Sequence, residues 1–394
     1  MSSSQPLSHL NSVELLELMN RYYAGERVSA LLQGFKIHCS VGLLCSHFPP
    51  EPTHEICRFC DAAMIRPRRS RSWRYSVELR CSQCAHFETT HCKCPGCQEV
   101  RRLAEQKQLQ QQSSKVVQFC LEHWSYNESA VEPSQLSALE ALAFISLVRC
   151  GGWLDEYRIG PLQASSIPFA PSSPCFQADL IDRLITVGLV SPDMSSSLTA
   201  FSGLHGKILN WDLEKVQWLL RIPVAADFVH ALEDVVASSA WPQNWKMECT
   251  KIWHELAVAE CKEFCAYSVS QRDLPMPGAT AVSALVENLL RDFSVSQCYQ
   301  LIWASASDAT DYRVRKGITA RHAANYLIGV CQRRADRSRA EGWTIKGFHR
   351  NFQLGRSQIS YVLHDVFLKH GEIGFFACPN PLIDTPDKQA VRPD

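Results

Sequence analysis

The chain contains, between positions 57 and 97, the stretch Cys57-Arg-Phe-Cys60 … Cys81-Ser-Gln-Cys84 … Cys92-Lys-Cys94-Pro-Gly-Cys97. Its first two C-x2-C pairs are separated by 20 residues. This spacing is typical of two tight turns that together offer four thiolates to one tetrahedral Zn²⁺. A segment this short, with few large apolar residues, can gain from metal ligation the folding free energy that a small core lacks. The stretch therefore predicts a small module folded around zinc.

The spacing is compatible with more than one grouping of the Cys and His ligands. The simplest first site consists of Cys57, Cys60, Cys81 and Cys84, and a second, Cys3His site then consists of Cys92, Cys94 and Cys97 with His86 or His91. Alternatively, Cys81 and Cys84 pair with Cys94 and Cys97, and Cys57 and Cys60 join His54 or Cys92. The choice between one zinc ion and two stays open. Because a catalytic zinc keeps an open coordination position and this stretch offers more than four thiolates, we expect structural metal.

Because of these two C-x2-C pairs, here called knuckles, residues 51–98 resemble a zinc ribbon, a fold in which a β-hairpin finger lies between the knuckles. Here the interval from Arg66 to Arg80 holds six Arg and one Glu, interleaved with Trp73 and Tyr75. Guanidinium groups suit phosphates, and aromatic rings suit bases. We expect nucleic-acid contacts from Arg66, Arg68, Arg69, Arg71, Trp73 and Arg74. The alternatives are a solvated basic loop and a contact with an acidic protein surface.

Residues 1–50 predict three short helices. Asn11 and Glu14 form a capping box before the first helix, Gly25 ends it, the second covers 28–35, and Ser40 can cap the third. The segment 22–37 resembles the DNA-binding helix-turn-helix of the resolvase and transposase type. Its apolar positions are occupied by Val28, Leu31, Phe35 and Ile37, whereas Leu32 and Lys36 stand where a small residue and glycine are favoured. The resemblance implies that the helix beginning at Ser40 enters a DNA groove.

The rest of the chain predicts a mainly α protein. Residues 99–133 are a polar helix or linker, and residues 134–211 form a mixed domain compatible with a winged helix, with short strands near 188–193 and 207–212. Residues 212–380 follow helical periodicity and predict a large all-helical domain, and residues 381–394 predict a disordered tail. Its expected helices are 213–220, 225–236, 244–266, 279–293, 296–309, 320–340 and 358–369.

Charge is segregated along the chain although its net value is zero. Residues 313–356 carry eleven Lys or Arg against Asp336 and Glu341, whereas residues 134–264 carry fifteen acidic and nine basic residues. We expect the basic block to contact nucleic acid through Arg313, Arg315, Lys316, Arg321, Arg333, Arg334 and Arg337. The alternative is that these charges face solvent or the acidic middle of the same chain.

The cysteine spacing and the length of the apolar stretches indicate in which cellular compartment the protein is expected. The other eleven of the 18 cysteines show no paired spacing, and residues 1–10 lack a basic segment followed by an apolar run. The longest apolar stretch, 139–148, is about half of the roughly 20 residues that span a bilayer. We expect a soluble cytoplasmic protein without a membrane partner; a homo-oligomer is compatible with this sequence.

Together these features predict a zinc-containing, DNA-binding protein, such as a bacterial transcriptional regulator or a mobile-element accessory factor. One alternative is a zinc-stapled protein-interaction component of a regulatory or phage-defence system. Another is a nuclease or transposase-like enzyme that uses His322 and His349 in the basic block. No spacing typical of a catalytic site supports the enzyme, so we expect no catalytic residues.

Overall fold

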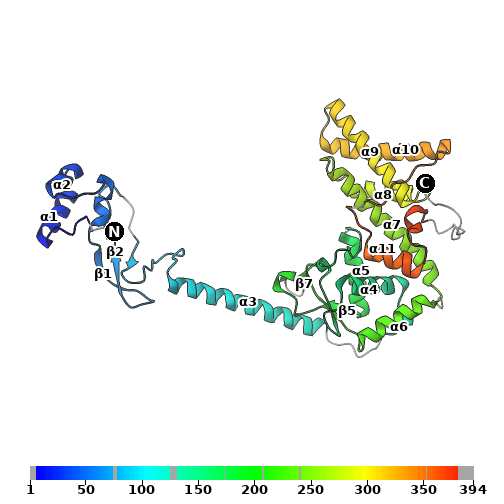
Figure 1. Cartoon of the computed structure of the whole chain (residues 1–394), viewed down its shortest axis with the longest axis horizontal. Coiled ribbons are helices and arrows are strands. Elements are labelled where there is room, and N and C mark those ends of the chain that lie inside the picture. The colour runs from blue at the N-terminus through cyan, green and yellow to red at the C-terminus, as the bar shows by residue number, and fades with distance from the viewer. Residues whose placement is uncertain are drawn as a thin grey trace. The chain divides into compact units, whose positions relative to one another are not determined.

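A computed structural model describes residues 6–73, 78–124, 131–172, 174–205, 208–238, 241–351 and 353–379 (Figure 1). The chain divides into two compact units, Met1–Gln112 (unit 1) and Ser113–Asp394 (unit 2). Helices predominate in the described residues, which confirms the predicted mainly α class. The expected tail, 381–394, lies outside the described residues.

Unit 1 begins with three helical segments. They are α1 (Ser12–Tyr23), α2 (Val28–Gly34) and a 3-10 helix (Val41–His47). The predicted capping box is confirmed, because Asn11 Oδ1 accepts from the amides of Val13 and Glu14 while Glu14 accepts from Asn11 N at 2.9 Å. The third segment differs from the expected α-helix: it is a 3-10 helix, and Ser40 makes no side-chain cap. The helix-turn-helix itself stays a prediction.

The end of α2 explains the two residues that depart from the helix-turn-helix pattern. Lys36 adopts a left-handed conformation with φ 52°. Its amide bonds the carbonyl of Gln33 at 3.3 Å, and the amide of Ile37 bonds the carbonyl of Leu32 at 2.8 Å. This is a Schellman motif with Lys36 in the place that glycine usually takes, and it brings Leu32 and Ile37 together in the apolar cluster of these helices.

A three-stranded antiparallel sheet follows, in the order β1-β2-β3. Its strands are β1 (Glu51–Ile56), β2 (Ala63–Arg66) and β3 (Arg80–Cys81). The register places Met64 opposite Cys81. The polar helix expected within 99–133 is α3 (Pro95–His123), which ends in unit 2.

Unit 2 is built mostly of helices. These are α4 (Ala138–Gly151), α5 (Pro174–Val187), α6 (Ala225–Ala237), α7 (Trp245–Ser270), α8 (Ala279–Leu289), α9 (Val295–Lys316), α10 (Ala320–Glu341), α11 (Gln358–Tyr361) with a π-helical continuation (Val362–Phe367), and α12 (Ile373–Phe376). Short 3-10 helices occur at Pro133–Gln135, Leu162–Ala164 and Leu198–Ala200. Ser137 and Glu140 form the predicted capping box of α4.

Five short strands form two small sheets in unit 2. The strands are β4 (Arg158–Ile159), β5 (Val190–Pro192), β6 (Phe201–His205), β7 (Ile208–Trp211) and β8 (Trp218–Leu220), in the orders β4-β8-β5 and β6-β7. The two strands expected near 188–193 and 207–212 therefore exist as β5 and β7 but lie in different sheets. The helix expected at 213–220 is wrong, because the backbone of Trp218 and Leu219 pairs with β4 and β5.

Two apolar cores hold unit 2 together. The larger joins α4, α5 and α6 to the first part of α7 and to the π-helical segment, with Phe144 and Trp245 fully enclosed. The smaller packs the second part of α7 against α8, α9 and α10. Since α7 contributes to both cores, it connects the two halves of this unit.

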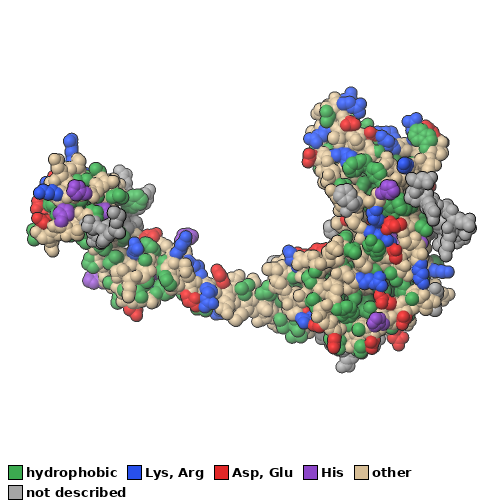
Figure 2. Space-filling model, in the orientation of Figure 1, with side chains coloured by type: hydrophobic (Ala, Val, Ile, Leu, Met, Phe, Trp, Pro, Cys, Tyr) green, Lys and Arg blue, Asp and Glu red, His purple; other side chains and the backbone are tan. Residues whose placement is uncertain are grey.

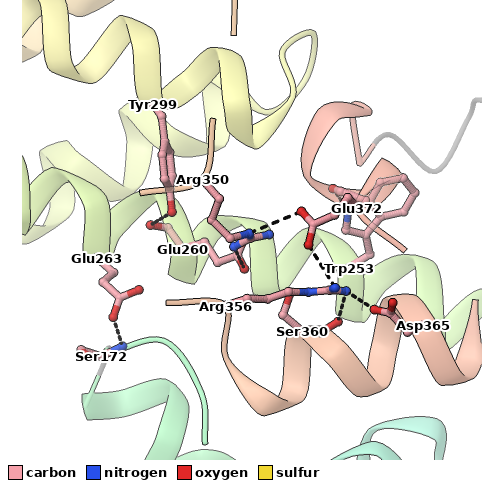
Figure 3. Close-up of polar contacts among 11 residues, drawn as sticks. Ser172, Trp253, Glu260, Glu263, Tyr299, Arg350, Arg356, Ser360, Asp365 and Glu372 are labelled. Atoms are coloured by element: carbon pink, nitrogen blue, oxygen red, sulfur yellow. Dashed lines mark hydrogen bonds and ion pairs between the residues drawn. The ribbon is translucent and has the colours of Figure 1, made fainter. Parts of the chain in front are cut away.

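A partly buried ionic network ties the C-terminal segment to α7 (Figure 3). Glu260 on α7 accepts from Arg350 at 2.9 Å, and Arg356 pairs with Asp365 and Glu372. Trp253 donates to the carbonyl of Gly374 at 3.0 Å. Two arginines of the predicted basic block are therefore paired with carboxylates of the same unit: Arg350 with the buried Glu260, and the buried Arg356 with Asp365 and Glu372, which are exposed.

No helix in the described part of the chain is long and apolar enough to cross a membrane.

Candidate metal centres

Two turns of the same geometry carry the first four cysteines. In each, the amide of the first cysteine bonds a carbonyl five residues on: Cys57 to Ala62 and Cys81 to His86, both at 2.8 Å. The residue after each second cysteine, Asp61 or Ala85, is left-handed with φ 55°. Each turn therefore closes tightly enough to point both of its thiols to the same side.

Cys57, Cys60, Cys81 and Cys84 meet with their sulfurs within 4.8 Å of one another. The closest cross-turn pairs are Cys57–Cys84 at 3.6 Å and Cys60–Cys81 at 3.3 Å. A tetrahedral ion with bonds of about 2.3 Å to sulfur separates its ligands by about 3.8 Å. The four thiols thus form a nearly closed tetrahedron, and the group could hold one metal ion.

A second group combines His86 with Cys92, Cys94 and Cys97, all buried. His86 Nδ1 lies 3.4, 3.5 and 3.4 Å from the three sulfurs in that order. For metal bonds of about 2.3 Å to sulfur and 2.0 Å to nitrogen, the expected nitrogen–sulfur edge is about 3.5 Å. This group could also hold one ion, with Nδ1 as the nitrogen ligand.

Helix α3 begins inside this second group. Cys94 directly precedes Pro95, the first residue of the helix, and Cys94 Sγ accepts from the amide of Cys97 at 3.4 Å. The sulfur thus takes the place of a capping oxygen, and proline suits the first helical position because its missing N–H would have no partner there. The positive end of the helix favours a thiolate at this point.

Phe59 joins the two groups, and sequence reasoning missed it. Its ring packs against both cysteine clusters and lies edge-on to His86 at 4.9 Å between centroids. A Cβ added to Gly96 would lie 2.4 Å from the Phe59 ring. Cys84 and His86, which belong to different groups, are separated by one residue. The two centres therefore form one structural module.

The pKa shifts of the ligand thiols go both ways: burial raises the pKa of Cys84 to about 12 and raises that of Cys94, whereas backbone amides favour the thiolate forms of Cys81 and Cys92. Burial raises the pKa of the Cys81 thiol, but the amides of Cys84 and Gln83, each 3.4 Å from its sulfur, oppose this, and the pKa falls to about 6. Burial likewise raises the pKa of Cys92, and the amides of Phe87 and Cys94 bring it to about 6. Thiolates are the forms that bind metal.

Two arginines lie beside the second ligand group. Arg58 Nη2 lies 3.7 Å from Cys97 Sγ, and Arg101 donates to the carbonyls of Thr90 and Cys92. Four thiolates around a divalent ion leave two net negative charges, and three thiolates with a neutral imidazole leave one. Arg58 and Arg101 offset part of that charge. Neither was expected from the spacing, because an arginine within a C-x2-C pair, such as Arg58, or on a polar helix, such as Arg101, carries no distinctive signal.

The structure decides among the ligand alternatives. His86 lies in the second group, whereas His91 and His54 are exposed outside both. The alternative that pairs Cys81 and Cys84 with Cys94 and Cys97 is not adopted. Among the described residues, these are the two groups in which three or more potential ligands converge.

The arginines expected to contact nucleic acid in unit 1 have two different environments. Arg68 pairs with Glu51, and Arg71 donates to the carbonyls of Tyr22 and Glu26 at 3.1 and 2.7 Å. Within the described residues, the Arg66 and Arg69 side chains are exposed and make no ion pair. Trp73 is 56% exposed, and Arg74 lies outside the described residues.

Residues 66–73, here called the arginine segment, also bind the N-terminal helices through the backbone. Tyr23 donates to the carbonyl of Arg69 at 2.8 Å, and Tyr22 Oη lies 3.2 Å from Ser70 Oγ. The Arg71 guanidinium stacks over the Tyr22 ring. The segment is therefore a clamp between the sheet and α1, rather than wholly a free basic loop.

The basic residues predicted to bind nucleic acid in unit 2 also have two different environments. Arg334 pairs with Asp308 and Arg337 with Glu341, whereas Arg333 stacks over Tyr326. The remaining four, which lie around the turn between α9 and α10, are Arg313, Arg315, Lys316 and Arg321. His322 and His349 are exposed and belong to neither of the convergent ligand groups found among the described residues.

Comparison with known proteins gives no match: no family model, curated protein or solved structure is similar to this chain.

Proposed function

We propose that this chain is a zinc-dependent DNA-binding protein in which two structural Zn²⁺ ions fold unit 1. The observation that carries the metal assignment is the convergence of four thiols in one group and of three thiols and one imidazole in the other. Thiolate and imidazole ligands at tetrahedral spacing are the donor set that zinc prefers. Each group supplies four protein ligands, so each ion would be fully coordinated and would serve stability rather than catalysis.

The DNA assignment rests on the charges that the fold leaves exposed. Arg66 and Arg69 project from a segment whose backbone is fixed between the sheet and α1, with Tyr23 bound to the Arg69 carbonyl at 2.8 Å. Guanidinium groups on an ordered backbone lose less freedom when they bind phosphates than groups on a loose loop. Zinc would thus act indirectly, because the Cys81 strand pairs with β2, which leads into this segment.

A matched pair of variants tests this proposal. We expect Arg69→Gln to weaken binding of the full-length, zinc-loaded protein to a labelled DNA duplex roughly three- to tenfold at low salt, measured by fluorescence anisotropy. Arg102→Gln, which removes an arginine already paired with Glu99, is the control and should change affinity less than twofold. Equal losses, or no duplex binding at low salt, would contradict DNA binding by unit 1.

A second candidate function is protein docking. Trp153, Leu154 and Tyr157 are 44, 52 and 41% exposed on one loop of unit 2. Exposed aromatic and aliphatic side chains close together are typical of protein interfaces. Sedimentation of the purified protein over a concentration series, compared with a Trp153→Ser variant, distinguishes a self-association surface from an inert loop: concentration-dependent association of the parent alone would support docking.

A further inference from the structure

The turn between α9 and α10 concentrates positive charge on a rigid support. Gly317, left-handed with φ 61°, ends α9, and Thr319 caps α10 by accepting from His322 N at 3.2 Å. Tyr312 and Tyr326 stack across the two helices with centroids 4.2 Å apart. Ile318 in the turn packs into a cluster with Ala306, Ala309, Ala323 and Leu327. The end of this helix pair is therefore held in place by its own core.

The cations at this end contact neutral groups. Arg321 donates to the carbonyl of Met276 at 2.9 Å, Arg313 to that of Asp273 at 3.4 Å, and Arg315 to that of Asp311 at 3.4 Å. No carboxylate in the described part of the chain forms an ion pair with these arginines or with Lys316. Residues 311–322 hold four cations and one carboxylate, Asp311, a net charge of 4 − 1 = +3. Figure 2 shows Lys and Arg side chains over the part of unit 2 that contains α9 and α10.

Helix stability alone does not account for this arrangement. Arg313, Arg315 and Lys316 lie at the carboxyl end of α9, where cations favourably meet the negative end of the helix dipole. Arg321, however, lies in the first turn of α10, where the dipole is positive and a cation is unfavourable. The negative end of α9 offsets part of the charge of three of these cations, whereas Arg321 adds to the positive amino end of α10. The net charge of this end stays positive, which suits an anionic partner.

We infer that the α9–α10 end, defined as Arg313, Arg315, Lys316 and Arg321, is a second surface for nucleic-acid phosphates that works without metal. It deepens the proposed function and rests on it for the class of ligand, but it lies in unit 2 and shares no residue with the zinc module. Its contacts would be to the phosphate backbone, because long basic side chains at a turn supply charge without a groove-reading element. Binding here would be independent of base sequence.

Charge-matched double variants test this inference in the full-length protein. Arg315→Gln with Lys316→Gln removes two charges that have no carboxylate partner among the described residues, and Arg334→Gln with Arg337→Gln removes two that are paired with Asp308 and Glu341. The probe is a labelled DNA duplex of arbitrary sequence in a salt titration. The first variant should bind about tenfold more weakly at low salt, and the slope of log affinity against log salt should be shallower by roughly 1 to 2. The second should stay within about twofold of the parent.

The outcomes separate this inference from the proposed function. Equal weakening in both double variants would show a response to net charge alone and would overturn the inference. If DNA binding depends on Arg69 but not on the α9–α10 end, the inference is overturned and DNA binding by unit 1 stands. If DNA binding depends on the α9–α10 end but not on Arg69, only the unit 1 assignment is overturned. A preference for poly-glutamate over DNA, measured by competition, would identify an acidic protein partner and also overturn it. Thermal unfolding of both variants, expected to match the parent, excludes misfolding as the cause of lost binding.

Discussion

Single residues decide details that spacing leaves open. Both His86 and His91 were compatible with a Cys3His site, because each is close in sequence to Cys92. The structure places His86 in the site because its own carbonyl closes the second turn by accepting from Cys81 N, which fixes the ring beside the three sulfurs. The ligands in the first group follow directly from the C-x2-C spacing, whereas this choice depends on how the turn closes.

The burial of a single side chain, His364, makes the free energy of unfolding depend on pH. This ring is 3% exposed, with Nδ1 2.9 Å from His370 Nε2, and a Cβ on Gly374 would lie 2.3 Å from it. Burial, followed by the positive neighbours His370, Arg356 and Arg350, lowers the pKa of His364 well below its usual value. In the folded protein the imidazole is therefore neutral at pH values where the unfolded chain already binds a proton.

The sign follows from proton uptake on unfolding. Below the unfolded pKa of about 6.5, the unfolded state gains a proton that the folded state does not, so the free energy of unfolding falls as the pH falls, by about 1.4 kcal/mol at pH 5.5 from this group. We expect a His364→Asn variant to lose this part of the pH dependence between pH 7.5 and 5.5. Urea unfolding followed by tryptophan fluorescence measures it, because nine of the ten tryptophans lie in unit 2. Identical pH slopes in variant and parent would contradict the argument.

At the scale of elements, local signals predicted helices well and strands poorly. Capping residues such as Asn11, Ser137 and Thr319 each begin a helix in the structure. The strand β8 was missed because Trp218, Leu219 and Leu220 are too few to show an alternating pattern, and their pairing partners lie in β4 and β5, far away in the sequence. Contacts between distant segments also explain why the spacing of the knuckles does not reveal that the arginine segment packs against α1.

The arginine segment gives a prediction at this scale. We expect Arg71→Gln to reduce the free energy of unfolding of unit 1 by about 1 kcal/mol, since it removes hydrogen bonds to the carbonyl of Tyr22 in the last turn of α1 and to that of Glu26 after it, and a cation–π contact with Tyr22. Arg69→Gln is the control: its backbone carbonyl, not its guanidinium, holds Tyr23, so stability should not change. Hydrogen exchange of the amides in the last turn of α1 measures the effect. Equal protection in both variants would mean that the clamp does not hold the helix.

At the scale of the whole molecule, the sequence predicted the mainly α class and a cysteine-rich module. It could not show how the charges of the basic block divide. Of that block, Arg350 is paired with the buried Glu260, and Arg356, Arg334 and Arg337 are paired with exposed carboxylates, whereas the α9–α10 end has no carboxylate partner among the described residues. Composition gives only the sum of these charges, and the fold determines which of them face a partner.

The central claim is that unit 1 folds around two zinc ions, one in each ligand group. Native mass spectrometry of the full-length protein tests it most directly by counting bound metal. The parent should carry two zinc ions; Cys84→Ser and His86→Ala should each lose the ion of their own group, while His91→Ala and Cys175→Ser, which change an exposed histidine and an exposed cysteine outside both groups, should retain two. A parent protein with no zinc or with one, or a loss of metal on changing His91 but not His86, would contradict the account.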